Sequence, residues 1–250
     1  MGGKIECYLD IVSYYSYVTF VQLQQNKELL RQNGIELQIH PFLLGAINAA
    51  TGNRPPWLLP AKGKYSKYET KRAAAAVGLK NISVPGDLMA VSKTMLPMRA
   101  ATYIKSAFPE EVYTTTFAYL LHAFWTLHKI PNTAPVLSEV LSEIPARFRL
   151  GCFDSPSAPN PPSSSEKLFT PEQVTRILEA ASTEEMKSAL KSRVDEALAR
   201  GAFGAPWIWA TDAQGRSEPF FGSDRWHCVY DFLHVPYEKM HLLPPQTAQL

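Results

Sequence analysis

Ser13 lies where the chain passes from a predicted strand into a predicted helix. Residues 5–9 are rich in apolar side chains and are typical of a buried strand, and a helical pattern begins at Ser16 or a neighbour and ends at Gln32. The N-terminus of such a helix presents free N–H groups and about half a positive charge, which favours a thiolate over a thiol. Ser13 can add a hydroxyl donor to the same sulfur. The alternative is that Ser13 or Ser16 only caps the helix.

Pro206 follows a helix that ends at Gly201, and it directly precedes a short predicted strand at residues 207–210. A cis peptide bond between Ala205 and Pro206 would expose the main-chain N–H and C=O groups of Ala205. Those groups can pair with an extended peptide, as an added strand does. An ordinary trans-proline turn is the alternative.

Ser223 and Asp224 stand at the predicted start of the last helix, which reaches about Leu233. Asp224 can accept a hydrogen bond from a ligand ammonium group, and Ser223 with its N–H can bind a carboxylate. The alternative is that the pair forms an ordinary helix cap.

The elements that must position these residues follow a simple order. Alternation of apolar and polar residues over 35–39 predicts a second strand, so the chain opens with a parallel strand–helix–strand unit. Prolines at 55, 56 and 60 predict a loop. A block of helices follows, with helical patterns at residues 66–77, 97–107 and 110–128. Two further helices are predicted to start at a capping box at 170–173 and at Thr183. Strands at 207–210 and 218–221 then form a hairpin before the last helix.

This order predicts the α/β class: a thioredoxin-like domain, β–α–β and then β–β–α, with an all-helical insertion between its halves. We expect the thioredoxin-like domain at residues 1–55 and 184–250 and the helical insertion at 56–183. A Pro/Ser-rich stretch at 152–165 is predicted to be a surface loop of the insertion.

Composition narrows the function. A formal net charge of +2 without a run of basic residues argues against nucleic acid as a partner, and no apolar run is long enough for a membrane span. The six histidines show no metal-ligand spacing, so we expect no metal. Three scattered cysteines, Cys7, Cys152 and Cys228, fit a reducing compartment, and the early strand leaves no room for a signal peptide. We therefore expect a soluble intracellular protein. The cytosol is the expected compartment, and the mitochondrion and the peroxisome are the alternatives.

Four segments, taken together, resemble the kappa class of glutathione transferases. This class belongs to the DsbA-like thioredoxin-fold group, which also includes 2-hydroxychromene-2-carboxylate isomerases. The resemblance covers most of the chain, and its four segments lie at residues 10–16, 44–65, 201–206 and 221–225. One departure is Tyr14, which stands where the family usually has proline. The stretch at residues 152–165, which resembles an insertion, is a second departure from the family pattern.

The resemblance implies a glutathione site in which Ser13 activates the sulfur. Seven further residues are implied to bind the tripeptide: Tyr15, Asn53, Lys62, Ala205, Pro206, Ser223 and Asp224. In this assignment Asn53 and Lys62 hold the backbone and the glycine carboxylate. Ala205 pairs with the cysteinyl part, Ser223 and Asp224 hold the γ-glutamyl end, and Tyr15 lines the pocket beside the sulfur.

Three functions remain open on these grounds. The leading one is transfer of glutathione to an apolar electrophilic small molecule, with glutathione as co-substrate. A glutathione-dependent double-bond isomerase would use the same glutathione residues. A non-catalytic glutathione- or ligand-binding module is the third. The family also implies a homodimer.

Overall fold

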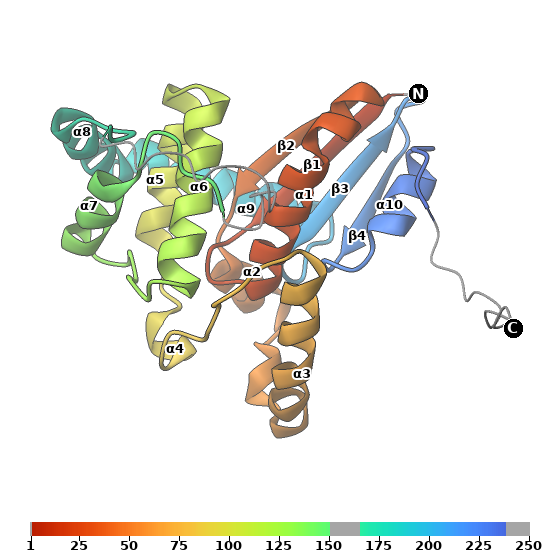
Figure 1. Ribbon diagram of the computed structural model, residues 1–250, viewed down its shortest axis with the longest axis horizontal. Helices are drawn as coiled ribbons and strands as arrows, with labels where there is room; N and C mark the ends of the chain where they lie inside the picture. The colour runs from red at the N-terminus through yellow and green to blue at the C-terminus, as the bar shows by residue number, and fades with distance from the viewer. Residues whose placement is uncertain (1, 151–165, 239–250) are drawn as a thin grey trace, which may run out of the picture.

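The computed structural model describes residues 2–150 and 166–238, and its core is a four-stranded sheet (Figure 1). The strands lie in the order β2-β1-β3-β4, with bounds β1 Gly3–Leu9, β2 Ile35–Pro41, β3 Trp207–Asp212 and β4 Ser217–Phe221. β1 pairs with β2 in parallel and with β3 in antiparallel register. The predicted thioredoxin-like arrangement of the α/β class is therefore confirmed.

Alternation along β1 gives the sheet two covered faces. Ile5, Cys7 and Leu9 are fully buried in a core that includes helix α1 (Tyr14–Gln32) and helix α10 (Trp226–Phe232). Tyr8 points to the opposite face and packs with α2 (Leu44–Thr51) and α9 (Glu184–Ala199). Helices thus cover both faces, and the carboxyl end of β1 leads directly into the Ser13 loop.

Most helices between β2 and β3 form a block beside the sheet, apart from α2 and α9, which pack on one of its faces (Figure 1). Helix α5 (Met95–Ala107) contacts α6, α8 and α9 as well as β2, so it ties this block to the sheet. The other members are a short 3-10 turn η1 (Pro56–Leu58), α3 (Pro60–Ala76), α4 (Leu88–Val91), α6 (Glu110–Trp125), α7 (Ala134–Glu143) and α8 (Pro171–Ser182). Figure 1 shows α3 projecting away from the rest of the block. The proposed domain boundaries stay a prediction, and the 152–165 stretch lies outside the described residues.

Several predicted boundaries are wrong, each for a local reason. Pro60 begins α3 instead of belonging to a loop, because proline at the first helical position loses no hydrogen bond. The helix predicted to reach His128 ends at Trp125, and His128 has a φ of 54°, outside helical geometry. Helices α2, α4 and α7 have no counterpart in the sequence-based prediction. By contrast, the capping box at Thr170 and Gln173 is present as predicted.

Candidate active site

Ser13 is the N-cap of α1 and is almost completely buried, with 7% of its surface exposed. Its Oγ accepts a hydrogen bond from the Ser16 amide at 3.1 Å and donates one to the Ala205 carbonyl at 3.3 Å. The backbone at Ser13 is extended, which turns the side chain back over the first helical turn. The capping interpretation is therefore correct, and the same hydroxyl also joins the two halves of the thioredoxin-like domain.

The first turn of α1 keeps two donors free beside Ser13. Within the described residues, neither the Tyr14 amide nor the Tyr15 amide has a hydrogen-bond acceptor. These N–H groups add to the positive end of the helix dipole. An anion placed next to Ser13 would meet one hydroxyl and two main-chain donors, and this donor set suits a thiolate.

Asp10 holds this loop from beneath and is fully buried. One of its carboxylate oxygens accepts from the Val12 amide at 3.2 Å, and the other accepts from the Leu44 amide at 2.8 Å and the Thr94 hydroxyl at 3.0 Å. Burial raises the pKa of Asp10 to about 6, against the lowering effect of these hydrogen bonds. Asp10 therefore joins the Ser13 loop to the starts of α2 and α5. The sequence analysis missed this role, although a carboxyl directly after an apolar strand was a signal for it.

The peptide bond between Ala205 and Pro206 is cis, which is one of the two possibilities that the sequence analysis left open. The Ala205 carbonyl faces Ser13, and the Pro206 carbonyl accepts from the Gly222 amide at 3.3 Å. The loop before β3 is thereby fixed between the start of α1 and the end of β4. An extended ligand that paired with Ala205 would lie directly beside Ser13.

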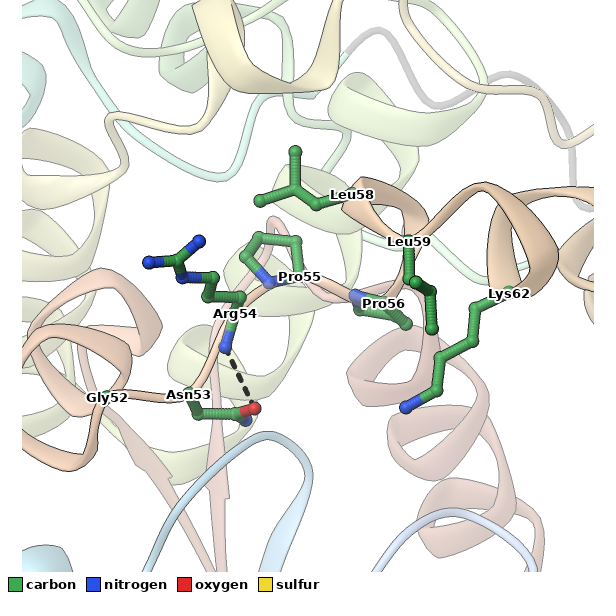
Figure 2. Close-up of a pocket in the computed structure, with 8 residues that line it drawn as sticks. All are labelled: Gly52, Asn53, Arg54, Pro55, Pro56, Leu58, Leu59 and Lys62. Carbon is green, nitrogen blue, oxygen red and sulfur yellow. Dashed lines mark hydrogen bonds between the residues drawn. The ribbon is translucent and has the colours of Figure 1, made fainter.

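Asn53 belongs to a proline-containing strap, residues 52–58, and Lys62 follows it in the first turn of α3; both line a pocket of about 360 Å³ (Figure 2). The Asn53 amide donates to the Phe203 carbonyl at 2.6 Å and accepts from the Arg54 amide at 2.9 Å. In Figure 2 the Lys62 ammonium points to the same side of the strap as the Asn53 amide. Among the described residues, no acidic side chain pairs with Lys62. The pocket thus offers a cation to a carboxylate.

Ser223 and Asp224 do not cap the last helix, so that prediction is wrong. Helix α10 begins at Trp226, and its N-cap is Arg225, without a side-chain capping bond. Gly222, with a φ of 98°, turns the chain at the end of β4, which leaves Ser223 buried and Asp224 exposed in a turn before the helix. The Asp224 side chain is 69% exposed and pairs with Arg225 at 3.0 Å.

Tyr15 lies in the first turn of α1, two residues after Ser13. Burial raises the pKa of its phenol, and the negative groups of Glu69, Tyr65 and Asp224 raise it further. These electrostatic partners come from α3 and from the turn before α10. The structure therefore brings Ser13 and Ala205 together beside the cis bond to Pro206, and Tyr15 follows in the first turn of α1.

Comparisons with known proteins agree with this geometry. A family model described as the DSBA-like thioredoxin domain matches residues 4–145, more than half of the chain. The chain is 27% identical to glutathione S-transferase kappa 1 of Caenorhabditis elegans, covering 99% of this chain and 98% of that protein. It is 26% identical to glutathione S-transferase kappa 1 of Homo sapiens, covering 96% and 94%. The predicted resemblance to the kappa class is thereby confirmed.

A solved structure of 2-hydroxychromene-2-carboxylate isomerase shares the fold. It matches with a TM-score of 0.66 and 16% identity, covering 92% of this chain and 94% of that one. The sheet order, the helical block between β2 and β3, and the family match lead to one conclusion. This chain belongs to the family of DSBA-like thioredoxin domains.

Proposed function

We propose that the protein is a glutathione transferase of the kappa type, in which Ser13 stabilises the glutathione thiolate for attack on an electrophilic small molecule. One observation carries this function. The Ser13 hydroxyl lies at the open N-terminus of α1 and faces the carbonyl of Ala205, the residue before the cis-proline. Relatives named glutathione S-transferase kappa that align over nearly the whole chain support the same activity.

Glutathione fits the charges around Ser13. It carries two carboxylates and one ammonium. This site supplies Lys62, which pairs with no acidic side chain of the described residues, together with the turn at Ser223 and the exposed Asp224. In our assignment the cysteinyl main chain pairs with Ala205, and the glycine carboxylate lies against Lys62 near Asn53. The γ-glutamyl end lies at Ser223 and Asp224, and Tyr15 covers the sulfur.

The chemistry requires the thiol to lose its proton to solvent before the attack. Ser13 has a single hydroxyl proton, which it donates to the Ala205 carbonyl in the ligand-free site. When the tripeptide binds, that proton turns to the sulfur, and the free amides of Tyr14 and Tyr15 support the negative charge. The sulfur then forms a bond to the electrophilic carbon, and the leaving group departs with its electron pair. Ser13 orients the sulfur and stabilises its negative charge, and it takes up no proton from the thiol.

We also propose that the protein is a homodimer. The surface of η1 and α3 carries exposed apolar side chains, which a monomer would leave in water: Leu58, Leu59, Tyr65 and Tyr68. A second copy of the chain can cover them. Light scattering of the purified protein tests this, and a monomer at micromolar concentration would contradict it.

We also propose that the protein works in a reducing compartment, and that this compartment is the cytosol. Cys7 and Cys228 are free thiols in the described part of the chain. No described helix has the combined length and hydropathy to cross a membrane. Imaging of the tagged protein in cells tests the compartment.

The reaction is tested by incubating the purified protein with glutathione and a panel of electrophiles and identifying the products by mass spectrometry. A glutathione conjugate is the expected product. An isomerised substrate with regenerated glutathione would instead assign the isomerase function. Tight glutathione binding without turnover on the whole panel would identify a binding module. Absence of glutathione binding by calorimetry would contradict all three.

A further inference from the structure

Helix α3 is weakly anchored for an element that carries part of the site. None of its 17 residues is buried. Its partly covered side chains are mostly small, namely Gly63, Ser66, Thr70, Ala73 and Ala74. Such a stripe buries little apolar surface, so packing alone holds the helix only loosely. The polar contacts of α3 therefore decide where it lies.

Tyr14 supplies one of these contacts. Its hydroxyl donates to the Thr70 carbonyl, in the middle of α3, at 2.7 Å. Burial raises the pKa of Tyr14 to about 12, so the hydroxyl keeps its proton and remains a donor at neutral pH. The other described anchor, Gln25 to the Val77 carbonyl at 3.0 Å, lies beyond the C-terminal end of the helix. Tyr14 thus provides a side-chain anchor near the middle of α3, while the N-terminal end of the helix contacts the short turn η1 that precedes it.

The Tyr14 ring is itself fixed in place. It packs edge-on against Trp125 of α6, with ring centroids 5.3 Å apart and an interplanar angle of 86°. The Trp125 indole N–H in turn donates to the Ile11 carbonyl at 2.8 Å. A rigid connection therefore runs from the Ser13 loop, through α6 and Tyr14, to α3.

We propose that Tyr14 is a positioning residue that fixes α3 relative to Ser13 and thereby sets the place of Lys62 for the glycine carboxylate of glutathione. This inference rests on the proposed function. Lys62 lies eight positions before Thr70 on the same helix, about 12 Å along its axis. Small tilts of α3 at Thr70 would move the ammonium away from a carboxylate bound beside Asn53. Proline, the usual residue of the family at this position, has no hydroxyl for this bond.

Tyr14 is distinct from a residue that acts on the sulfur. Its hydroxyl is directed at a main-chain carbonyl of α3. Loss of that hydroxyl should therefore change glutathione affinity and leave the pKa of the bound thiol unchanged. A purely structural residue would instead lower the stability of the whole protein without a specific effect on α3.

The test uses Tyr14→Phe, which keeps the ring against Trp125 and removes only the hydroxyl. Hydrogen exchange of the ligand-free protein should show faster exchange in α3, by about fivefold, and no change in α1. Calorimetry should show about fivefold weaker glutathione binding, while kcat and the pH profile of the reaction stay the same. Tyr65→Phe is the matched control, because the Tyr65 hydroxyl donates at 2.9 Å to Glu69 within the same helix. This control should leave exchange in α3 unchanged.

A double-mutant cycle with Lys62→Met decides whether Tyr14 acts through Lys62. In the Lys62→Met background, Tyr14→Phe should no longer weaken glutathione binding. Equal losses in both backgrounds, or unchanged exchange in α3, would overturn the inference, as would a raised thiol pKa in Tyr14→Phe. Failure of the wild-type protein to bind glutathione would instead contradict the proposed function, and faster exchange in α3 would then still support the tether.

Discussion

The Asn53 side-chain amide donates to the Phe203 carbonyl at 2.6 Å, and this bond joins two segments 150 residues apart. It connects the strap over the pocket to the loop that carries Ala205 and the cis-proline. Gly204 lies under this bond, and a Cβ there would come within 2.9 Å of the Phe221 ring. The two sides of the proposed glutathione groove are thus held at a fixed separation before any ligand arrives.

Asn53→Asp should disrupt this separation. The new carboxylate would face the Phe203 carbonyl without a proton to share, so the strap and the cis-proline loop would move apart. We expect about tenfold weaker glutathione binding by calorimetry. Asn33→Asp is the matched control, because the Asn33 amide also donates to a main-chain carbonyl, Leu29 at 2.8 Å, but far from the site. Equal affinity of Asn53→Asp and wild type would contradict a role of this bond in binding.

Ser13→Ala should raise the pKa of the bound thiol and lower turnover by about a hundredfold, while glutathione affinity stays within about tenfold. The thiolate would lose its hydroxyl donor but keep the helix N-terminus. The measurement is the pH dependence of the rate with a saturating electrophile. Thr183→Ala controls for the lost helix cap, because Thr183 caps α9 in the same way through the Met186 amide. An unchanged pH profile in Ser13→Ala would be evidence against thiolate stabilisation by Ser13.

Asp224→Asn should weaken glutathione binding, because the γ-glutamyl ammonium loses its charged partner. The Asp224 carboxylate is exposed, so we expect a loss of about fivefold, and less at high salt. Asp195→Asn is the matched control, since Asp195 is also an exposed carboxylate paired with a neighbouring cation on its own helix. The comparison is made by calorimetry at low and high ionic strength. Equal losses of glutathione affinity in the two variants would show that Asp224 does not bind glutathione.

Asp10→Asn should change how stability depends on pH. Burial raises the folded-state pKa of Asp10 from 3.8 to about 6, so folding favours its protonated form. Stability from this group is fully present below pH 3.8 and is lost as the pH rises through about 6. The loss corresponds to about 3 kcal/mol.

Urea unfolding of wild type and Asp10→Asn at several pH values measures this difference. Asparagine has one side-chain oxygen, which can replace the acceptor of the Leu44 amide and the Thr94 hydroxyl but leaves the Val12 amide without one, so the variant has a constant cost that does not depend on pH. The gap in unfolding free energy between the two proteins should therefore narrow as the pH rises. A gap that stays the same from acid to neutral pH would show that Asp10 keeps its ordinary pKa.

The elements at the two ends of the chain were predictable because their signals are local. Alternation at residues 35–39 and the turn at Gly215 report directly on backbone periodicity and turn geometry. The start of α3 was not predictable, because Pro60 is compatible with a loop as well as with a first helical turn. Likewise Ser223 has the residue type of an N-cap, but the turn at Gly222 delays the helix to Trp226.

The residues of the site also fall into those that the sequence alone could predict and those that it could not. Ser13 and the Ala205–Pro206 bond could be found from their places beside a helix start and a strand start. The role of Asp10 could not, because its partners Leu44 and Thr94 lie 34 and 84 residues away and depend on how α2 and α5 pack. The tether from Tyr14 to Thr70 depends on tertiary packing for the same reason.

The placement of the helical block between β2 and β3 has a consequence for synthesis of the chain. β1 is a central strand, yet its second neighbour, β3, begins only at Trp207. Until the ribosome has made that strand, one hydrogen-bonding edge of β1 stays unpaired while the helices emerge. The nascent chain is therefore exposed to wrong strand pairing while the segment between β2 and β3 is made, and its sheet can close only after β3 and β4 have emerged.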